Sequence, residues 1–279
     1  MDILTTPDQM RAWRRSRPDT VGFAPTMGYL HEGHLTLARR AKEENDRAVV
    51  STFVNPTQFG PNEDFARYPR DEDRDLTLLE SAKVDAVYMP MPATMYQAGY
   101  ETHVTVEQVT KPLEGMARPG HFRGVATVVL KLLNAVEPTR AYFGRKDAQQ
   151  LRVIRAMARD LDLGVEIVAC DIVREADGLA MSSRNVYLSE RQRAGAPIIR
   201  QALLEAAEQW TSGTRDADRI RATVNARIGL EPFAAVEYVS LADDESLTEL
   251  VGMVTKPALL SVVVRFGPTR VLDNIELKP

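Results

Sequence analysis

The 279-residue sequence contains a single cysteine, Cys170. An intrachain disulfide is therefore excluded, and nothing points to an oxidising compartment. Cys170 stands in the apolar run VEIVACDIV, which is typical of a buried strand residue rather than a nucleophile. No apolar run approaches the ~20 residues that a membrane helix needs, and the N-terminal MDILTTPDQMRAWRRSR lacks the apolar core of a signal peptide. These absences predict a cytoplasmic protein with no membrane partner.

Several motifs that carry chemistry are also missing. The sequence has no Walker A pattern, no Cys/His zinc spacing and no Gly-x-Ser-x-Gly elbow. The glycine fingerprint of dinucleotide-binding folds is absent, which argues against a dehydrogenase. With 35 basic against 39 acidic residues, the net charge of −4 gives no reason to expect a nucleic-acid partner. Any anion site must therefore come from the local placement of a few side chains.

Short apolar runs alternate with longer amphipathic segments through the first two thirds of the chain. Strands are predicted at 21–24, 48–54, 84–89, 141–143 and 165–173, with helices at 34–44, 71–82, 124–134 and 147–161. This alternation indicates a mostly parallel sheet with right-handed crossovers. In such sheets ligands bind beyond the carboxyl ends of the strands, so the loops after Ala24, Val54, Phe143 and Val173 are the places to search.

From about residue 176 the pattern changes. A long helix is predicted at 189–210, opening with a capping box of Ser189 and Gln192, and a second helix at 217–228. Short strand-like runs follow at 236–241, 259–266 and 270–272. The sequence therefore predicts two domains, 1–175 with the parallel sheet and 176–279 as a smaller α+β domain.

The segment PTMGYLHEGH follows the first of these strands. Gly28 and Gly33 permit close backbone approach or unusual dihedral angles. His31 and His34 are three residues apart and share one side if the helix has begun. Two imidazoles at a helix N-terminus suit a phosphate, because the unpaired N–H groups there also favour anions. The alternative is a junction with solvated histidines.

Four further segments carry candidate ligand groups, each with a structural alternative. Gln58 in FVNPTQFG offers amide groups to a hydroxy acid, or simply faces water. The acidic stretch 63–75 could hold Mg²⁺, or form a solvated helix start. In RPGHFRGV, two arginines on a glycine loop suit phosphate or carboxylate, or belong to a mobile surface loop. In FGRKDAQQ, Lys146 can reach a phosphate, and Asp147 with Gln150 can cap a helix.

The last segment, MSSRNVYL, lies at the predicted domain junction. Its two hydroxyls followed by an arginine form a phosphate-binding cluster, or a polar hinge.

These six segments, in this order, closely resemble the pantothenate synthetase family over nearly the whole chain. HEGH is similar to the HIGH signature of the nucleotidylyltransferase superfamily, and MSSRN to that superfamily's second phosphate loop. FVNPTQF, YPR, RPGHFRGV and KDAQQ indicate the pantothenate enzymes within it. The resemblance implies a Rossmann-like N-terminal domain, a smaller C-terminal lid, a homodimer, and Mg²⁺ with ATP as co-substrate.

The resemblance also implies site residues. His34, Lys146 and Arg184 are expected to be catalytic, and Gln58 and Gln150 to bind pantoate. The expected ATP contacts are Met27, Gly28, His31, His34, Gly144, Lys146, Asp147, Val173, Met181, Ser182, Ser183 and Arg184. Asp73 and Asp75 are the metal candidates, although Arg74 interrupts an acidic run that is often continuous in the family.

The implied reaction joins pantoate to β-alanine through a pantoyl adenylate, releasing AMP and pyrophosphate. The main alternative is another adenylyl- or cytidylyltransferase with the same HEGH chemistry. A nucleotide-sensing module is the non-enzyme alternative, and a dehydrogenase is a distant third.

Overall fold

The computed structural model describes residues 1–278, which form two compact units. The first unit contains Met1–Arg145 and Gln150–Asp171, and the second contains Lys146–Gln149 and residues 172–278. The division predicted at 175/176 placed Lys146–Gln149 in the first domain, whereas these four residues pack with the second unit. Lys146–Gln149 follow the strand that ends at Gly144, and no local sequence pattern indicates that they belong to the second unit.

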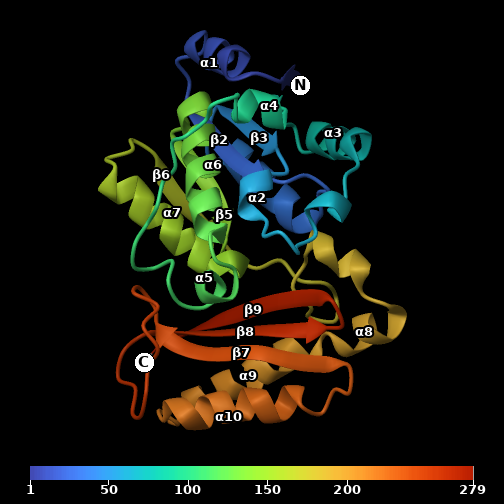
Figure 1. Cartoon of the computed structure of the whole chain (residues 1–279), viewed down its shortest axis with the longest axis vertical. Coiled ribbons are helices and arrows are strands. Elements are labelled where there is room, and N and C mark those ends of the chain that lie inside the picture. The colour runs from blue at the N-terminus through green and yellow to red at the C-terminus, as the bar shows by residue number, and fades with distance from the viewer. Residues whose placement is uncertain (279) are drawn as a thin grey trace. The chain divides into compact units, whose positions relative to one another are not determined.

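A parallel sheet forms the centre of the first unit (Figure 1). Within the described residues its six strands follow the order β1-β4-β3-β2-β5-β6, and every neighbouring pair is parallel. The strands are β1 (Asp2–Leu4), β2 (Val21–Thr26), β3 (Arg47–Thr52), β4 (Ala86–Tyr88), β5 (Arg140–Gly144) and β6 (Glu166–Cys170). The predicted parallel sheet is confirmed. The sequence missed β1, whose three residues are defined only by pairing with β4.

Helices cover this sheet, so that neighbouring residues such as Phe23 and Ala24 are both fully buried. On α2 (Glu32–Glu43), the buried residues Leu35, Ala38 and Ala41 recur every three positions, and the helix packs on β2, β3 and β5. The other helices are α1 (Pro7–Arg15), α3 (Glu72–Ser81), α4 (Pro92–Met95), α5 (Glu114–Ala117), α6 (His121–Val136) and α7 (Ala148–Asp160). Short 3₁₀ turns are η1 (Pro56–Gln58), η2 (Phe65–Arg67) and η3 (Arg145–Asp147). Across residues 1–278 no helix is long and apolar enough to cross a membrane.

The second unit is built on an antiparallel sheet in the order β7-β8-β9, with α9 and α10 packed against it (Figure 1). Its elements are η4 (Ser183–Tyr187), α8 (Glu190–Gly195), α9 (Ile198–Thr211), α10 (Ala217–Ile228), β7 (Ala234–Asp243), β8 (Ala258–Phe266) and β9 (Thr269–Leu277). The predicted small α+β arrangement and the capping box at Ser189 are confirmed. The single helix predicted at 189–210 was wrong, because Pro197 lacks the N–H that would continue it and α9 begins afresh at Ile198.

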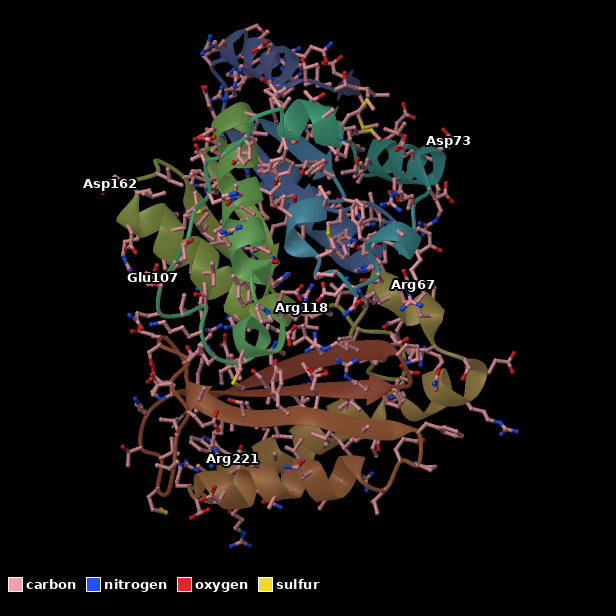
Figure 2. The ribbon with its side chains drawn as sticks, viewed as in Figure 1. Arg67, Asp73, Glu107, Arg118, Asp162 and Arg221 are labelled. Atoms are coloured by element: carbon pink, nitrogen blue, oxygen red, sulfur yellow. The ribbon has the colours of Figure 1, made fainter. Side chains whose placement is uncertain are left out.

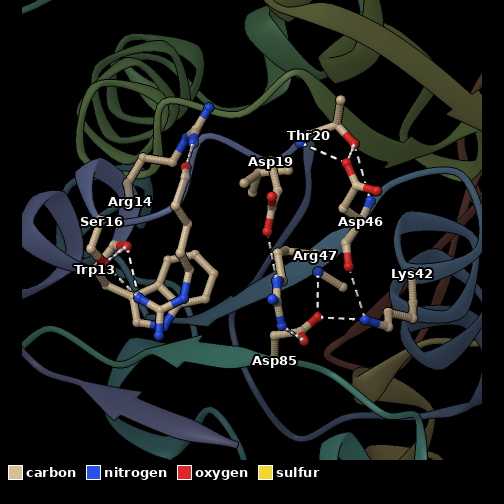
Figure 3. Close-up of polar contacts among 12 residues, drawn as sticks. Trp13, Arg14, Ser16, Asp19, Thr20, Lys42, Asp46, Arg47 and Asp85 are labelled. Carbon is tan, nitrogen blue, oxygen red and sulfur yellow. Dashed lines mark hydrogen bonds and ion pairs between the residues drawn. The ribbon is translucent and has the colours of Figure 1, made fainter.

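Ion pairs lie at the amino end of the large sheet (Figure 3). At the start of β3, Arg47 Nε lies 3.1 Å from Asp19 Oδ2, and Lys42 Nζ lies 2.9 Å from Asp85 Oδ2. Burial works to raise the pKa of Asp85, but hydrogen bonds from Ala48 N and Lys42 outweigh it and hold that pKa below its ordinary value. The charges at this end neutralise one another, so ligand groups are to be sought at the carboxyl end.

Candidate active site

The loop that follows β2 is held by a buried carboxylate. Asp75 is 3 % exposed and accepts hydrogen bonds from Tyr29 N at 2.6 Å and Leu30 N at 2.7 Å. Gly28 has φ +79°, and a Cβ there would stand 3.1 Å from Asp75 Oδ2. Burial raises the pKa of Asp75, and the two N–H donors oppose that rise. Gly28 thus supplies both the left-handed backbone and the space for this carboxylate.

His31 and His34 form a reciprocal cap at the start of α2. The Nδ1 atom of His31 accepts from Gly33 N at 3.1 Å, and that of His34 accepts from His31 N at 3.3 Å. The rings stack with centroids 4.0 Å apart, which confirms that the two residues share one side. Since Nδ1 is the acceptor in each ring, the neutral rings carry their proton on Nε2. Both side chains are therefore N–H donors at a helix N-terminus, as an anion site requires.

Gln58 lies beside this loop rather than facing bulk water. Its Nε2 is 3.1 Å from Met27 Sδ, and its Oε1 accepts from Asn55 Nδ2 at 2.9 Å. A Cβ on Gly124 would stand 2.3 Å from Thr57 O and 2.7 Å from Gln58 N, so α6 approaches η1 closely only because this residue is glycine. The loops after β2 and β3 thus meet at the carboxyl end of the sheet.

A half-buried ionic network contacts the backbone of Gln58. Arg118 binds Glu63 in bidentate fashion, with both N–O distances 2.7 Å, and Arg118 Nη1 donates to His121 Nε2 at 3.1 Å (Figure 2 labels Arg118). His121 Nδ1 donates in turn to Gln58 O at 2.8 Å. Burial opposes ionisation of Glu63, yet the bonds to Arg118 lower its pKa to about 2. In RPGHFRGV the arginines were predicted to bind phosphate or carboxylate. Arg118 binds the carboxylate of Glu63, a residue of the protein itself.

His121 makes stability depend on pH. Burial, and next the charge of Arg118, lower the pKa of His121 to about 4, while Gln58 O, Glu114 and Glu63 oppose them. The unfolded chain, with an ordinary pKa of 6.5, then binds more protons than the folded protein between these values. The free energy of unfolding is expected to fall as pH drops from about 6.5 towards 4.

Urea denaturation at pH 7 and pH 4.5 checks this expectation. His121→Asn keeps an amide donor for Gln58 O and should lose less stability between the two pH values than wild type. Replacement of the exposed His103 by asparagine is the matched control and should retain the wild-type profile. Equal losses in wild type and His121→Asn would contradict the assignment. Protonation of Glu63 in the unfolded chain, where its pKa is 4.5, adds a smaller loss of stability at pH 4.5 that wild type and both variants share.

The second unit carries most of the remaining candidates. Lys146 Nζ lies 3.5 Å from Asp147 Oδ1, and Met181 N donates to Val173 O at 3.0 Å. Ser182 caps η4 by accepting from Arg184 N at 3.2 Å, and Ser183 is buried. Val173 and Met181, both expected to contact ATP, are thus adjacent through backbone pairing. Of the other candidates, Gly144 ends β5 and Gln150 lies in α7, both in the first unit.

The proposed metal ligands differ sharply in their surroundings. Asp73 is exposed and points outward from α3 (Figure 2), while Asp75 is buried with both oxygens engaged by backbone N–H groups. Among residues 1–278 no group of three or more His, Cys, Asp or Glu side chains is placed to hold a metal ion. The observed role of Asp75 is to hold the glycine loop, so the described carboxylates do not fit a protein-built Mg²⁺ cage.

Sequence reasoning overlooked several groups that shape the site. Asn55, 1 % exposed and followed by a proline that indicates a turn, contacts Gln58, Thr57 and Tyr96. Glu63 belongs to the acidic stretch predicted either to hold Mg²⁺ or to form a solvated helix start, but its partner is Arg118, 55 positions away. An asparagine before proline does signal a turn, but nothing local reveals which side chains will converge on it.

Together, the fold and the site define a Rossmann-like α/β protein with a smaller second unit built on an antiparallel sheet. It presents a stacked histidine pair and a neighbouring glutamine at the carboxyl end of its parallel sheet. A family model described as pantoate-beta-alanine ligase matches residues 2–276. The chain belongs to the pantoate-beta-alanine ligase family, and it is therefore an enzyme rather than a sensing module or a dehydrogenase.

Individual relatives agree with this membership. Pantothenate synthetase of Herpetosiphon aurantiacus is 55 % identical over 275 residues, covering 99 % of each chain. The crystal structure of pantothenate synthetase from Thermus thermophilus has a TM-score of 0.95 at 46 % identity, with full coverage of both chains. The pantoate-beta-alanine ligase of Francisella tularensis, solved with beta-gamma ATP and beta-alanine, has a TM-score of 0.80 at 32 % identity and covers 99 % of this chain and 97 % of its own.

Proposed function

We propose that the enzyme uses ATP to condense pantoate with β-alanine, through a pantoyl adenylate, and releases AMP and pyrophosphate. The observation that carries the proposal is the contact of Gln58 with Met27, which puts an amide suited to a hydroxy acid beside the histidine-bearing loop. The Francisella relative was solved with an ATP species and β-alanine, and we extend both ligands to this chain.

In the first step the pantoate carboxylate attacks the α-phosphorus of ATP, and the bond to pyrophosphate breaks. A carboxylate with a pKa near ~4 is already ionised at neutral pH, so the step requires alignment and charge neutralisation rather than a base. Gln58 and Gln150 hold pantoate. The Nε2–H groups of His31 and His34 donate to phosphate oxygens as charge moves to the leaving group.

The other ATP contacts of the proposal lie in loops and at the ends of strands and helices. Lys146 and Arg184 neutralise the triphosphate and the departing pyrophosphate. The full proposed set is Met27, Gly28, His31, His34, Gly144, Lys146, Asp147, Val173, Met181, Ser182, Ser183 and Arg184.

In the second step the amine of β-alanine attacks the acyl carbon, and AMP leaves. That amine has a pKa of roughly 10 and arrives protonated, so it must lose a proton first. Solvent, a phosphate oxygen and His34 are the candidate acceptors. The adenylate is a mixed anhydride that water destroys, which is why we propose 176–279 as a lid over the ATP- and pantoate-binding domain, 1–175.

Three further parts of the proposal concern partners and location. Mg²⁺ would accompany ATP, because this ion usually keeps several waters and binds substrate phosphates. The enzyme is a homodimer, and it acts in the cytoplasm.

Pyrophosphate–ATP exchange tests the proposal directly. We expect exchange that depends on pantoate and proceeds without β-alanine. Exchange without pantoate, or none at all in the presence of ATP and pantoate, would refute the adenylate step. A nucleotidyltransferase of the alternative kind would form a stable nucleotide-linked product and ignore β-alanine.

Gln58→Ala tests the pantoate contact separately. Loss of one or two hydrogen bonds worth about 1–3 kcal/mol in total should raise the KM for pantoate about 5- to 150-fold, with a much smaller change in the KM for ATP. Steady-state kinetics with each substrate varied measures both. Gln97→Ala, at an exposed glutamine, is the control. Unchanged pantoate kinetics would remove Gln58 from the substrate site.

A further inference from the structure

The last strand, β9, gathers the segments of the second unit that carry the proposed phosphate ligands. Asn274 Nδ2 donates to the backbone carbonyl of Lys146 at 2.8 Å. The preceding residue, Asp273, binds Arg174 through two contacts of 2.6 and 3.0 Å. The turn η4, which contains Ser183 and Arg184, packs against the same strand.

Both β9 side chains are buried in a way that favours a single geometry. Asp273 is 2 % exposed and Asn274 is 4 % exposed. Asp273 Oδ1 also accepts from Asn274 N at 2.8 Å, which ties the two residues together. A buried polar group left without its partner is costly, so this arrangement resists alternatives.

Through Arg174, Asp273 is connected to the loop that carries Val173 and Met181. Arg174 Nη1 donates to Gly178 O at 3.1 Å, and Met181 N donates to Val173 O at 3.0 Å. The strand itself is secured at its far end, where Trp210 Nε1 donates to Lys278 O at 2.6 Å. A rigid strand thus supports three separate loop segments.

We propose that Asn274 is a positioning residue for ATP, which acts by holding the backbone at Lys146 so that its ammonium meets the triphosphate. The inference rests on the proposed function, because it needs Lys146 to be a phosphate ligand. Asn274 lies in none of the six motif segments of the sequence, and it is 128 positions from its partner Lys146.

A double-mutant cycle separates positioning from general support of the fold. ATP affinity is measured by calorimetry for wild type, Asn274→Ala, Lys146→Ala and the double variant. Loss of one hydrogen bond of about 1 kcal/mol should weaken ATP binding about 5- to 10-fold in the wild-type background. In the Lys146→Ala background the same substitution should change affinity less than about 2-fold, because the side chain being positioned is gone.

Two further variants and a folding measurement serve as controls. Thr269→Val, a near-isosteric change at a buried position five residues earlier on β9, should leave ATP affinity at the wild-type value. Asn274→Ser is a second variant, and thermal unfolding checks that each protein folds. An equal effect of Asn274→Ala in both backgrounds, no effect in either, or failure of both Asn274 variants to fold would overturn the proposal. Unaltered ATP affinity in Lys146→Ala would instead refute the proposed role of Lys146.

Discussion

Replacing His34 by alanine is expected to lower turnover about 10²- to 10³-fold, the loss typical when one donor to a developing negative charge is removed. Substrate binding should weaken far less, because the donor matters most as pyrophosphate departs. Rates of adenylate formation by single turnover, together with KM values, measure the two effects. A variant with normal turnover would defeat the catalytic role.

The structure adds a necessary control, because His34 also caps α2. His34→Ala removes the acceptor for His31 N and should cost about 1 kcal/mol of stability. Glutamine at this third helical position is a standard capping-box residue, so His34→Gln should keep the cap while removing the imidazole. We expect His34→Gln to unfold at nearly the wild-type temperature and to lose turnover as the alanine variant does. Full activity in His34→Gln would show that only the cap is required.

Replacing Asp75 by asparagine is expected to destabilise the protein by about 2–3 kcal/mol and to reduce activity severely. An amide retains one acceptor oxygen and turns its NH₂ group towards a backbone N–H, so one charge-assisted bond to Tyr29 N or Leu30 N is lost. Tyr29 has φ +50°, a strained conformation that the carboxylate helps to maintain. Urea denaturation and steady-state rates measure both losses.

The companion variant Asp73→Asn decides between loop support and metal binding. If Asp75 supports the loop, Asp75→Asn is impaired even at saturating Mg²⁺, and the exposed Asp73→Asn behaves as wild type. If the two carboxylates hold the metal, both variants should need more Mg²⁺ for half-maximal rate and recover at high Mg²⁺. Titration of activity with Mg²⁺ therefore tests whether Asp73 and Asp75 are metal ligands.

Local patterns were sufficient for most elements of both units. The helix α2 and the strand β3 are marked by apolar spacing, and Ser189 with Gln192 marks the start of α8. The error at 189–210 arose because the apolar period continues across Pro197, although the backbone cannot. Strand β1 escaped notice because it gains its identity from β4, which lies more than 80 residues away.

The sequence by itself determined the alternation of strands and helices in the first unit, the α+β character of the second and the family, because each depends on residues close together in the chain. Only the tertiary structure decided that Asp75 serves the backbone of the glycine loop, that Arg118 serves Glu63, and that Asn274 reaches Lys146. The physical reason is that a buried polar group must find a partner, and packing, rather than sequence distance, determines which partner is within reach.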